Sequence, residues 1–336
     1  MANTRVSVRE IFDSSPATSS YQMLVCLLCF LVMFLDGFDL MVTGVAIPKI
    51  AEFLHSKPSA LDLAVSAGLI GTFIGSMGLG MLADRSGRKW MLVVSAFVFG
   101  FFTILVASVT AVWQLALFWF IAGIGLGGVI PNALAFGSEY APSRLRKTFV
   151  ATMFAGLPVG ATLSGLVSAW FIPQFCWRSL FVLGGVSPIV ITLLTTAFLP
   201  EPLEFLVGKG KDKVRIRNIV AKIAPALARD EKAEFYSAEK KLPEVPVRNL
   251  FTERRALITI PFWITLIAAN WFGAVLVVWA PTMLHKSGAT VVQYSLAFAG
   301  LNFGSVVLTI LYSDPPRARG RLYALSSKAD SRKSGC

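Results

Sequence analysis

The sequence predicts an all-α membrane protein, and three observations support this prediction. Of its 336 residues, 55% are hydrophobic and only 15% are charged. The mean hydropathy of +0.67 is far above that of a soluble domain. Eight apolar segments are each long enough to cross about 30 Å of hydrocarbon as a helix. They cover residues 22–47, 62–83, 90–109, 112–134, 148–171, 178–199, 256–281 and 289–312.

The order of these segments predicts four regions along the chain. Residues 1–200 contain six closely spaced segments and form an N-terminal six-helix transmembrane bundle. Residues 201–255 are polar and Lys-rich, which is typical of a cytoplasmic linker, and residues 256–312 contain two further transmembrane helices. Residues 313–336 contain six cations, two prolines and no apolar run, so we expect a disordered tail. The composition changes abruptly from apolar to polar and basic after residue 312, as a frameshift or premature stop would produce.

One part of the linker has two interpretations. Residues 214–228 alternate apolar and basic side chains at helical spacing. Such a helix can lie along the membrane surface, or it can belong to a solvated linker.

The basic residues predict the orientation of the chain in the membrane. With the N-terminus in the cytoplasm, the short cytoplasmic segments carry eight Lys and Arg residues and the opposite side carries four. This bias follows the positive-inside rule. We therefore expect a multi-pass protein of the inner (plasma) membrane, surrounded by lipid and monomeric. The net charge of +12 reflects topology and does not indicate nucleic-acid binding.

The sequence contains no recognisable motif for enzyme chemistry or metal binding. There are only two histidines, His55 and His285, which we expect in loops outside the membrane, and no hydrolase, metalloprotease or nucleotide-loop motif occurs. Cys26 and Cys29 form a C-x-x-C, but no second pair exists and both lie in an apolar segment. We expect no cofactor and no metal, and a many-helix protein of this kind is most simply a transporter.

Small residues predict where the helices approach one another. They occur at four-residue spacing or in clusters, which lets backbones come close where lipid provides no hydrophobic drive between helices. The sets are Gly71 and Gly75; Gly123, Gly125, Gly127 and Gly128; and Gly156, Gly160, Ser164 and Ser168.

Two acidic residues lie inside the first apolar segment, where an unpaired carboxylate is costly. Asp36 and Asp39 are three residues apart, so a helix places them on one face. Burial disfavours the charged form of a carboxyl group, and a second carboxylate nearby adds to this effect. We predict that at least one of them exchanges a proton and couples substrate movement to a proton gradient. In the alternative interpretation, Asp39 caps or pairs near the outer interface and Gly37 loosens the helix.

The stretch "GMLADRSGRKWML" joins the second and third segments through a short cytoplasmic loop. A tight connection needs Gly87 for its turn, and Asp84 is free to pair with Arg88 or with facing helix ends. The order G-x-x-A-D-R-x-G-R-K matches the loop signature of the major facilitator superfamily. This motif consists of Gly80, Asp84, Arg85, Gly87, Arg88 and Lys89.

Together with "LDGFD" and "GIGLGGVIPNALAFGSEYAPSRLRK", this loop resembles the aromatic acid:proton symporter family of that superfamily. The resemblance implies two six-helix halves, alternating access around a central site, and benzoate-type carboxylates and protons as partners. The family's helix-1 acids fall on Asp36 and Asp39, and the glutamate after its fourth helix falls on Glu139, followed by Arg144. Asn132 lies in the same stretch and is a candidate substrate-site residue.

The sequence departs from the family pattern at two places. The family's fourth helix opens its glycine motif with arginine, a natural partner for a carboxylate, and Trp119 stands there in this chain. After residue 312 the family continues into further helices, whereas this chain ends 24 residues later. We therefore expect a complete N-terminal six-helix bundle plus two helices of an incomplete C-terminal bundle. Two alternatives to the symporter stay open: a truncated, transport-inactive fragment, and a transporter of another organic anion.

The seventh segment contains "NWFGAVLVVWAPTML". Asn270 and Trp271 are candidates to line a cavity for an aromatic ring, because a ring stacks on tryptophan and an amide supplies a hydrogen bond. Trp279 fits such a cavity and an interfacial aromatic belt equally well.

Overall fold

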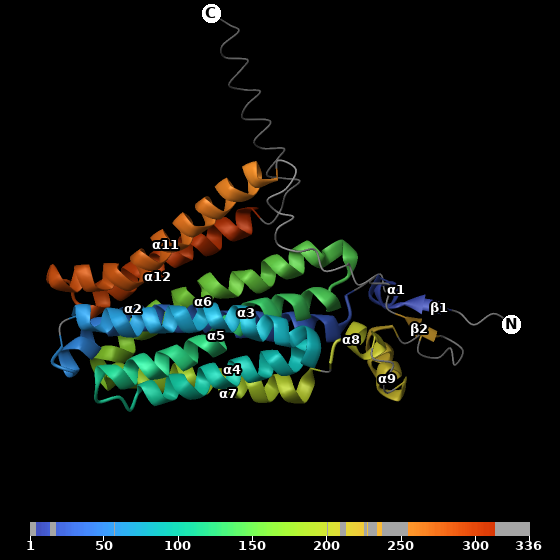
Figure 1. The fold of residues 1–336 in the computed structure, drawn as a ribbon, viewed down its shortest axis with the longest axis horizontal. Coiled ribbons are helices and arrows are strands. Elements are labelled where there is room, and N and C mark those ends of the chain that lie inside the picture. Colours follow the sequence, from blue (N-terminus) through green and yellow to red (C-terminus); the bar gives the residue numbers. More distant parts are fainter. Residues whose placement is uncertain are drawn as a thin grey trace, which may run out of the picture.

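The computed structural model describes residues 5–13, 18–56, 58–199, 201–208, 213–224, 227, 234–236 and 255–312. Six long helices form a bundle in which all axes run roughly along one direction (Figure 1). They are α2 (Ser20–Phe53), α3 (Asp62–Ser86), α4 (Arg88–Val106), α5 (Val112–Tyr140), α6 (Arg146–Phe175) and α7 (Trp177–Phe198). Short 3₁₀ turns precede α3 at Pro58–Leu61 and α6 at Ser143–Leu145.

The six apolar segments expected before residue 200 are confirmed as these six helices. Each is long and apolar enough to cross a membrane by length and composition, as is Ala256–Gly273 in α11. The helix α2 begins with a capping box, in which Ser19 accepts from the backbone and Gln22 bonds back to the Ser19 amide at 2.9 Å. It continues without a break through Asp36 and Asp39.

Close backbone approaches at small residues hold the bundle together, as the glycine spacing predicts. On α6, a Cβ added at Gly156 would lie 2.6 Å from the Phe30 carbonyl oxygen of α2. On α5, a Cβ at Gly125 would lie 2.7 Å from the Ser95 carbonyl oxygen of α4. Gly75 of α3 faces the backbone of Ile124 in α5 with equally little space. Side chains at these positions would force the helices apart.

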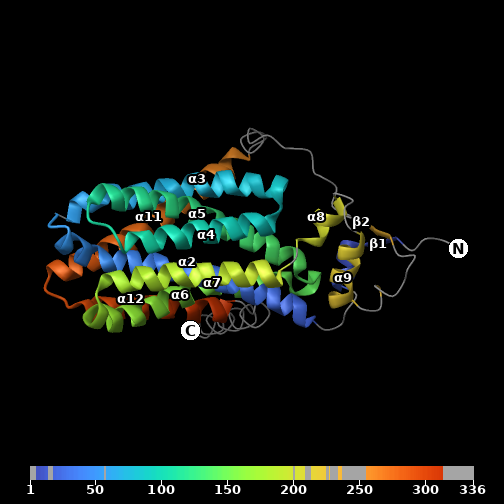
Figure 2. The same ribbon diagram turned by 90° about the horizontal axis from the view of Figure 1, so that it is seen from below.

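A small cap covers the end of the bundle where α2 begins and α5 ends. We call this the cap end and the other the opposite end. The cap joins the N-terminal segment to the middle of the chain: β1 (Arg5–Ser7) pairs in parallel with β2 (Glu234–Tyr236), beside three short helices (Figure 2). These helices are α1 (Val8–Asp13), α8 (Leu203–Gly208) and α9 (Lys213–Ile223). The two strands were not expected from the sequence.

The structure of the cap shows what covers the apolar face of residues 214–224, for which the sequence left two interpretations. Ile216, Ile219, Val220 and Ile223 of α9 are buried in a cluster with α1 and α2. The apolar face of α9 is therefore covered by protein rather than lying on a membrane surface. Its basic side chains, such as Arg215, lie on the remaining surface.

The last two described helices are α11 (Ala256–Lys286) and α12 (Val291–Tyr312). They lie against the bundle at the opposite end and diverge from it toward the cap end (Figure 1). Near the opposite end, Thr282 of α11 and Tyr294 of α12 are buried, and a Cβ at Gly165 of α6 would lie 2.7 Å from the Ser295 carbonyl oxygen. In contrast, none of the described side chains of the α11 span Ala256–Gly273 is buried. The tail expected at 313–336 lies outside the described residues.

Candidate functional site

The two acids of α2 lie midway along a continuous helix in the bundle. Asp36 is only 6% exposed, and one of its carboxylate oxygens is buried without a hydrogen-bond partner among the described residues. Asp39 is half-buried one turn further on. Gly37 does not interrupt the helix: it lies against the Leu157 backbone of α6, which brings the two helices together. Asp36 is therefore a polar group held away from water inside a helical bundle.

Two candidate residues of α5 are buried in the same bundle. The Asn132 side-chain amide donates to the Gly128 carbonyl oxygen one turn earlier, at 2.8 Å. Trp119 belongs to an apolar cluster with Phe38 and Val42 of α2. The position at which the family carries an arginine is thus buried in the bundle, with its Cβ next to Gly68 of α3.

The candidates on α11 are not gathered around these acids. Trp271 is 74% exposed and lines a surface cavity of about 580 Å³ whose walls are other α11 side chains, including Ile267 and Phe272. The side chain of Asn270 lies outside the described residues. Trp279 is half-buried toward the opposite end. The α2 and α5 candidates Asp36, Trp119 and Asn132 are therefore all buried in the bundle, whereas Trp271 is exposed on α11.

The loop motif forms a second group of polar residues, at the cap end. Gly87 has φ +104°, a left-handed conformation that favours glycine, and it both ends α3 and begins α4. Arg88 forms an ion pair with Glu139 near the end of α5. The buried Lys89 donates to the Thr196 carbonyl oxygen of α7 at 3.0 Å. The loop thus ties α4 to both α5 and α7.

The structure also places other predicted residues of this end. Gly80 lies in α3 with open space around it, and Arg85 and Arg144 are exposed. The side chain of Asp84 lies outside the described residues, so its expected pairing with Arg88 is not tested.

Sequence reasoning missed two residues that complete the group at the cap end. Glu201 is buried, and its carboxylate lies beside Gly87, where an added Cβ would be 2.8 Å from one oxygen. The Tyr140 hydroxyl donates to the Glu201 carbonyl oxygen at 3.1 Å, and the Gln22 amide donates to the Tyr140 carbonyl oxygen at 3.0 Å. An acid between two prolines directly after a transmembrane segment was the available signal for Glu201.

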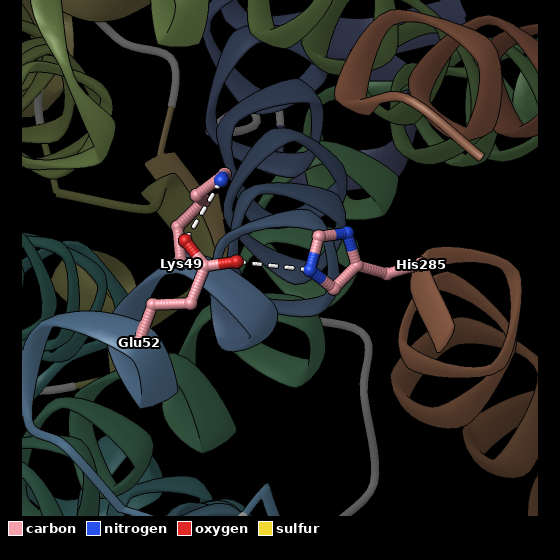
Figure 3. A network of polar contacts seen from close by, with 3 residues as sticks. All are labelled: Lys49, Glu52 and His285. Carbon is pink, nitrogen blue, oxygen red and sulfur yellow. Dashed lines mark hydrogen bonds and ion pairs between the residues drawn. The ribbon is translucent and has the colours of Figure 1, made fainter. Parts of the chain in front are cut away.

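A third polar group joins α2 to α11 at the opposite end (Figure 3). The Glu52 carboxylate accepts from Lys49 at 2.8 Å and contacts His285 Nε2 at 2.9 Å. His285 lies in the last turn of α11, so its placement in a loop was wrong; the helix extends past residue 281 to Lys286. This contact is the polar link between the bundle and α11 that Figure 3 shows.

The fold and these groups define a class: a multi-pass membrane protein with carboxyl groups inside an apolar helical bundle. The model of the Major Facilitator Superfamily matches residues 29–327, and the chain belongs to this superfamily.

Relatives and solved structures agree with this membership. The chain is 37% identical to a 4-hydroxybenzoate transporter PcaK of Acinetobacter baylyi, over 86% of this chain and 64% of that protein. It is 36% identical to the protein of the same name from Pseudomonas aeruginosa, over 96% of this chain and 73% of that protein. The chain therefore spans about two thirds of the length of these relatives. Their names are those of transporters, which supports the expectation that the chain is not an enzyme.

The fold resembles that of a solved membrane transporter. The xylose transporter XylE from E. coli, in a partially occluded inward-open conformation, aligns with a TM-score of 0.67. The alignment covers 87% of this chain and 70% of that chain at 18% identity, so it supports the fold alone.

Proposed function

We propose that the chain is a proton-coupled symporter that imports benzoate-type aromatic carboxylates across the membrane. The observation that carries this proposal is the carboxyl group of Asp36, buried in an apolar bundle with one oxygen unpartnered among the described residues. An ionised carboxylate in that position is costly, so uptake of a proton is favoured whenever the site is shielded from water. The names of the two relatives supply the substrate class.

The proposed roles follow from the positions of the side chains. Asp36 and Asp39 take up and release the proton. Trp119 and Asn132 of α5 contribute to the substrate site, because they are buried in the same bundle. Asn270 and Trp271 of α11 join them in the arrangement in which α11 closes over the bundle, as alternating access requires.

The loop motif is proposed to act as a conformational latch. The Arg88–Glu139 ion pair and the Lys89 hydrogen bond hold three helix ends in one arrangement. Asp84, Arg85 and the nearby Arg144 add charge at the same end. A latch of this kind biases one of two bundle arrangements, which is how a local charge contact controls a global transition.

We also propose that the cap end faces the cytoplasm of a cell whose inner (plasma) membrane holds the protein. The loop cations and the basic side chains of α9 lie at this end, in agreement with the positive-inside rule. The chain is proposed to act as a monomer in lipid, with no cofactor.

The test uses the 336-residue chain reconstituted in liposomes. We expect radiolabelled 4-hydroxybenzoate to accumulate when the outside is more acidic than the inside, and expect Asp36→Asn and Asp39→Asn to abolish accumulation while the proteins remain in the membrane. Leu40→Asn, at an exposed position of the same helix, is the control for a new amide in α2. Normal accumulation by both aspartate variants would refute proton coupling.

The exposed length of α11 favours a second candidate, a chain that binds substrate without transporting it. Saturable binding of 4-hydroxybenzoate without accumulation would identify this case. A competition series of benzoate, nicotinate and succinate then tests the substrate class. Stronger competition by succinate than by benzoate would instead indicate a transporter of another organic anion.

A further inference from the structure

A groove at the opposite end, next to the Lys49–Glu52–His285 group, has no part in the transport roles proposed above. It has a volume of about 470 Å³ and lies where α2, α6 and α12 meet. This volume falls within the usual range of small-molecule sites. Its lining residues are Lys49, Ile172, Pro173, Cys176, Trp177, Thr290, Val291 and Val292.

Lys49 provides the one charged side chain in the lining of this groove. Within the described part of the chain, its ammonium donates one hydrogen bond, to Glu52. A lysine ammonium has three N–H donors, so two are available to an anion in the groove. The side chain is 32% exposed, which gives a ligand access to it from solution.

The surrounding charges favour an anion in the groove. Arg178 lies beside the groove, with its guanidinium 5.0 Å from the centre of the Trp177 ring, and it donates to the Ala107 carbonyl oxygen at 2.8 Å. Lys286 lies at the end of α11 next to His285. Glu52 is the acid that faces Lys49, and its carboxylate is shared between Lys49 and His285. Lys49 in the lining and Arg178 beside Trp177 together outweigh the single charge of Glu52, which favours an anion in the groove.

The walls of the groove are apolar and rigid. Ile172 and Trp177 are buried, and Trp177 is fixed by an edge-to-face contact with Phe181 at 5.8 Å between ring centres. Val291 at the start of α12 forms the facing side. The groove therefore combines apolar walls with the cation Lys49 in its lining, which suits an apolar ligand that carries an anionic group.

We propose that this groove, called here the Lys49 groove, binds an aromatic monocarboxylate, with its carboxylate on Lys49 and its ring between Trp177 and Val291. The choice of ligand class rests on the proposed function, whereas the site is separate from Asp36. Because the lining comes from both the bundle and α12, a ligand bound here bridges the two parts. The groove thus serves as a capture site at the face from which substrate arrives.

Cys176 offers a direct test because it is exposed and lines the groove, whereas Cys26 and Cys29 are buried. Cys336, outside the described residues, is replaced by Ser so that a charged maleimide reports on Cys176. A bound ligand slows labelling by the factor 1 + [L]/Kd, about tenfold at roughly nine times Kd. We expect 4-hydroxybenzoate to give this protection, and cyclohexanecarboxylate to give less.

Two matched variants test whether ligand binding in the groove requires Lys49. Lys49→Gln should remove the protection, and Lys286→Gln, which changes another cation at the same end, should retain it. Asp36→Asn should also retain it, because labelling needs neither a proton gradient nor transport. Protection in the unaltered chain together with failed uptake by that same chain would leave the groove intact and refute only the transport proposal.

Two results would overturn the Lys49 groove. One is a labelling rate that 4-hydroxybenzoate does not change, and the other is equal protection in Lys49→Gln. Comparison of liposomes with and without phosphatidylglycerol separates a lipid occupant from a free acid. If this anionic lipid slows labelling and 4-hydroxybenzoate adds nothing, the groove is a lipid site and the proposal is wrong.

Discussion

At the scale of single residues, the Arg88–Glu139 ion pair shows how one contact joins two helix ends. Arg88 is the first residue of α4 and Glu139 lies one residue from the end of α5. Their side chains are 32% and 12% exposed, so solvent screens the pair only in part. Removal of one partner leaves the other charge poorly solvated, and this loss exceeds that of a fully exposed pair.

We expect Glu139→Gln to lower the free energy of unfolding by about 1–3 kcal/mol, between the values typical of surface and buried pairs. Thermal unfolding of the purified protein in detergent measures this loss. The exchanged pair Arg88→Glu with Glu139→Arg should recover part of it. An unchanged melting temperature in Glu139→Gln would show that the pair contributes nothing to stability.

Trp119 permits a second residue-scale prediction. A guanidinium buried without a partner costs several kcal/mol, so Trp119→Arg folds only if a carboxylate lies within reach. We expect the variant to remain folded and to bind 4-hydroxybenzoate more tightly than the unaltered chain, and the addition of Asp36→Asn to reverse the gain. Trp119→Leu controls for loss of the ring. Aggregation of Trp119→Arg, or unchanged affinity, would contradict a role for a cation at this position.

The sequence predicts some of these residues and not others, for a physical reason. Asp36 and Asp39 stand out because an acid in an apolar segment is costly wherever the helix packs. The contact of Glu201 with Gly87 joins residues more than one hundred positions apart, and no local pattern encodes it. The exposure of Trp271 likewise depends on what covers α11.

At the scale of helices, the glycine pattern on α3 is a feature that the sequence predicts well. A backbone contact in lipid requires small residues on both helices, so their spacing marks the contact face directly. Gly75 lies on the face toward α5, whereas Gly78 on the same helix has nothing within 4 Å of an added Cβ. The two positions therefore form a matched pair.

We expect Gly75→Leu to destabilise the bundle by at least about 1–3 kcal/mol, the usual cost of overpacking, because the new side chain meets the Ile124 backbone. Gly78→Leu should have little effect. The melting temperatures of the two variants in detergent test the difference. Similar values for both would show that the α3–α5 contact adjusts without cost.

The cap is harder to predict from the sequence than the glycine contacts, because the elements that pack together in it are distant in sequence. The periodicity of α9 predicts an amphipathic helix but not what covers its apolar face. The structure buries that face against α1 and the start of α2, and the Ser19 hydroxyl donates to the Lys222 carbonyl oxygen at 2.9 Å. Pairing of β1 with β2 adds a second link, which three-residue strands do not reveal in sequence.

The Glu52–His285 contact gives a local prediction for α11. Glu52 is 52% exposed and His285 is 32% exposed, so the contact contributes at most about 1 kcal/mol. We expect Glu52→Gln to speed amide exchange in the last turn of α11 while the melting temperature stays unchanged. Hydrogen–deuterium exchange measures this, with Lys286→Gln as the control. Equal exchange in the two variants would show that the contact does not hold α11 in place.

At the scale of the whole molecule, the bundle and the pair α11–α12 differ in how they are covered. In the most apolar stretch of α2, 67% of the residues are buried by protein. In α11, none of the described side chains of 256–273 is buried. The sequence predicts both helices equally well from hydropathy, because hydropathy does not distinguish burial in lipid from burial in protein. We propose the division 1–200, 201–255, 256–312 and 313–336, in which residues 5–13 of the first region form part of the cap.

This difference predicts two levels of stability within one chain. Buried contacts at Thr282, Tyr294 and Phe298 hold α11 and α12 near the opposite end, and no described side chain of 256–273 is buried to resist opening. Elements with few buried contacts open locally at a lower free energy than the core. We expect amides of 257–270 to exchange at least roughly tenfold faster than those of 32–47 in detergent, where lipid no longer orders the helices.

Equal protection of both segments would mean that another surface covers α11 in solution. Cross-linking at increasing protein concentration would then show whether a second copy provides this surface. Protection that rises in lipid bilayers but not with protein concentration would identify lipid as the cover.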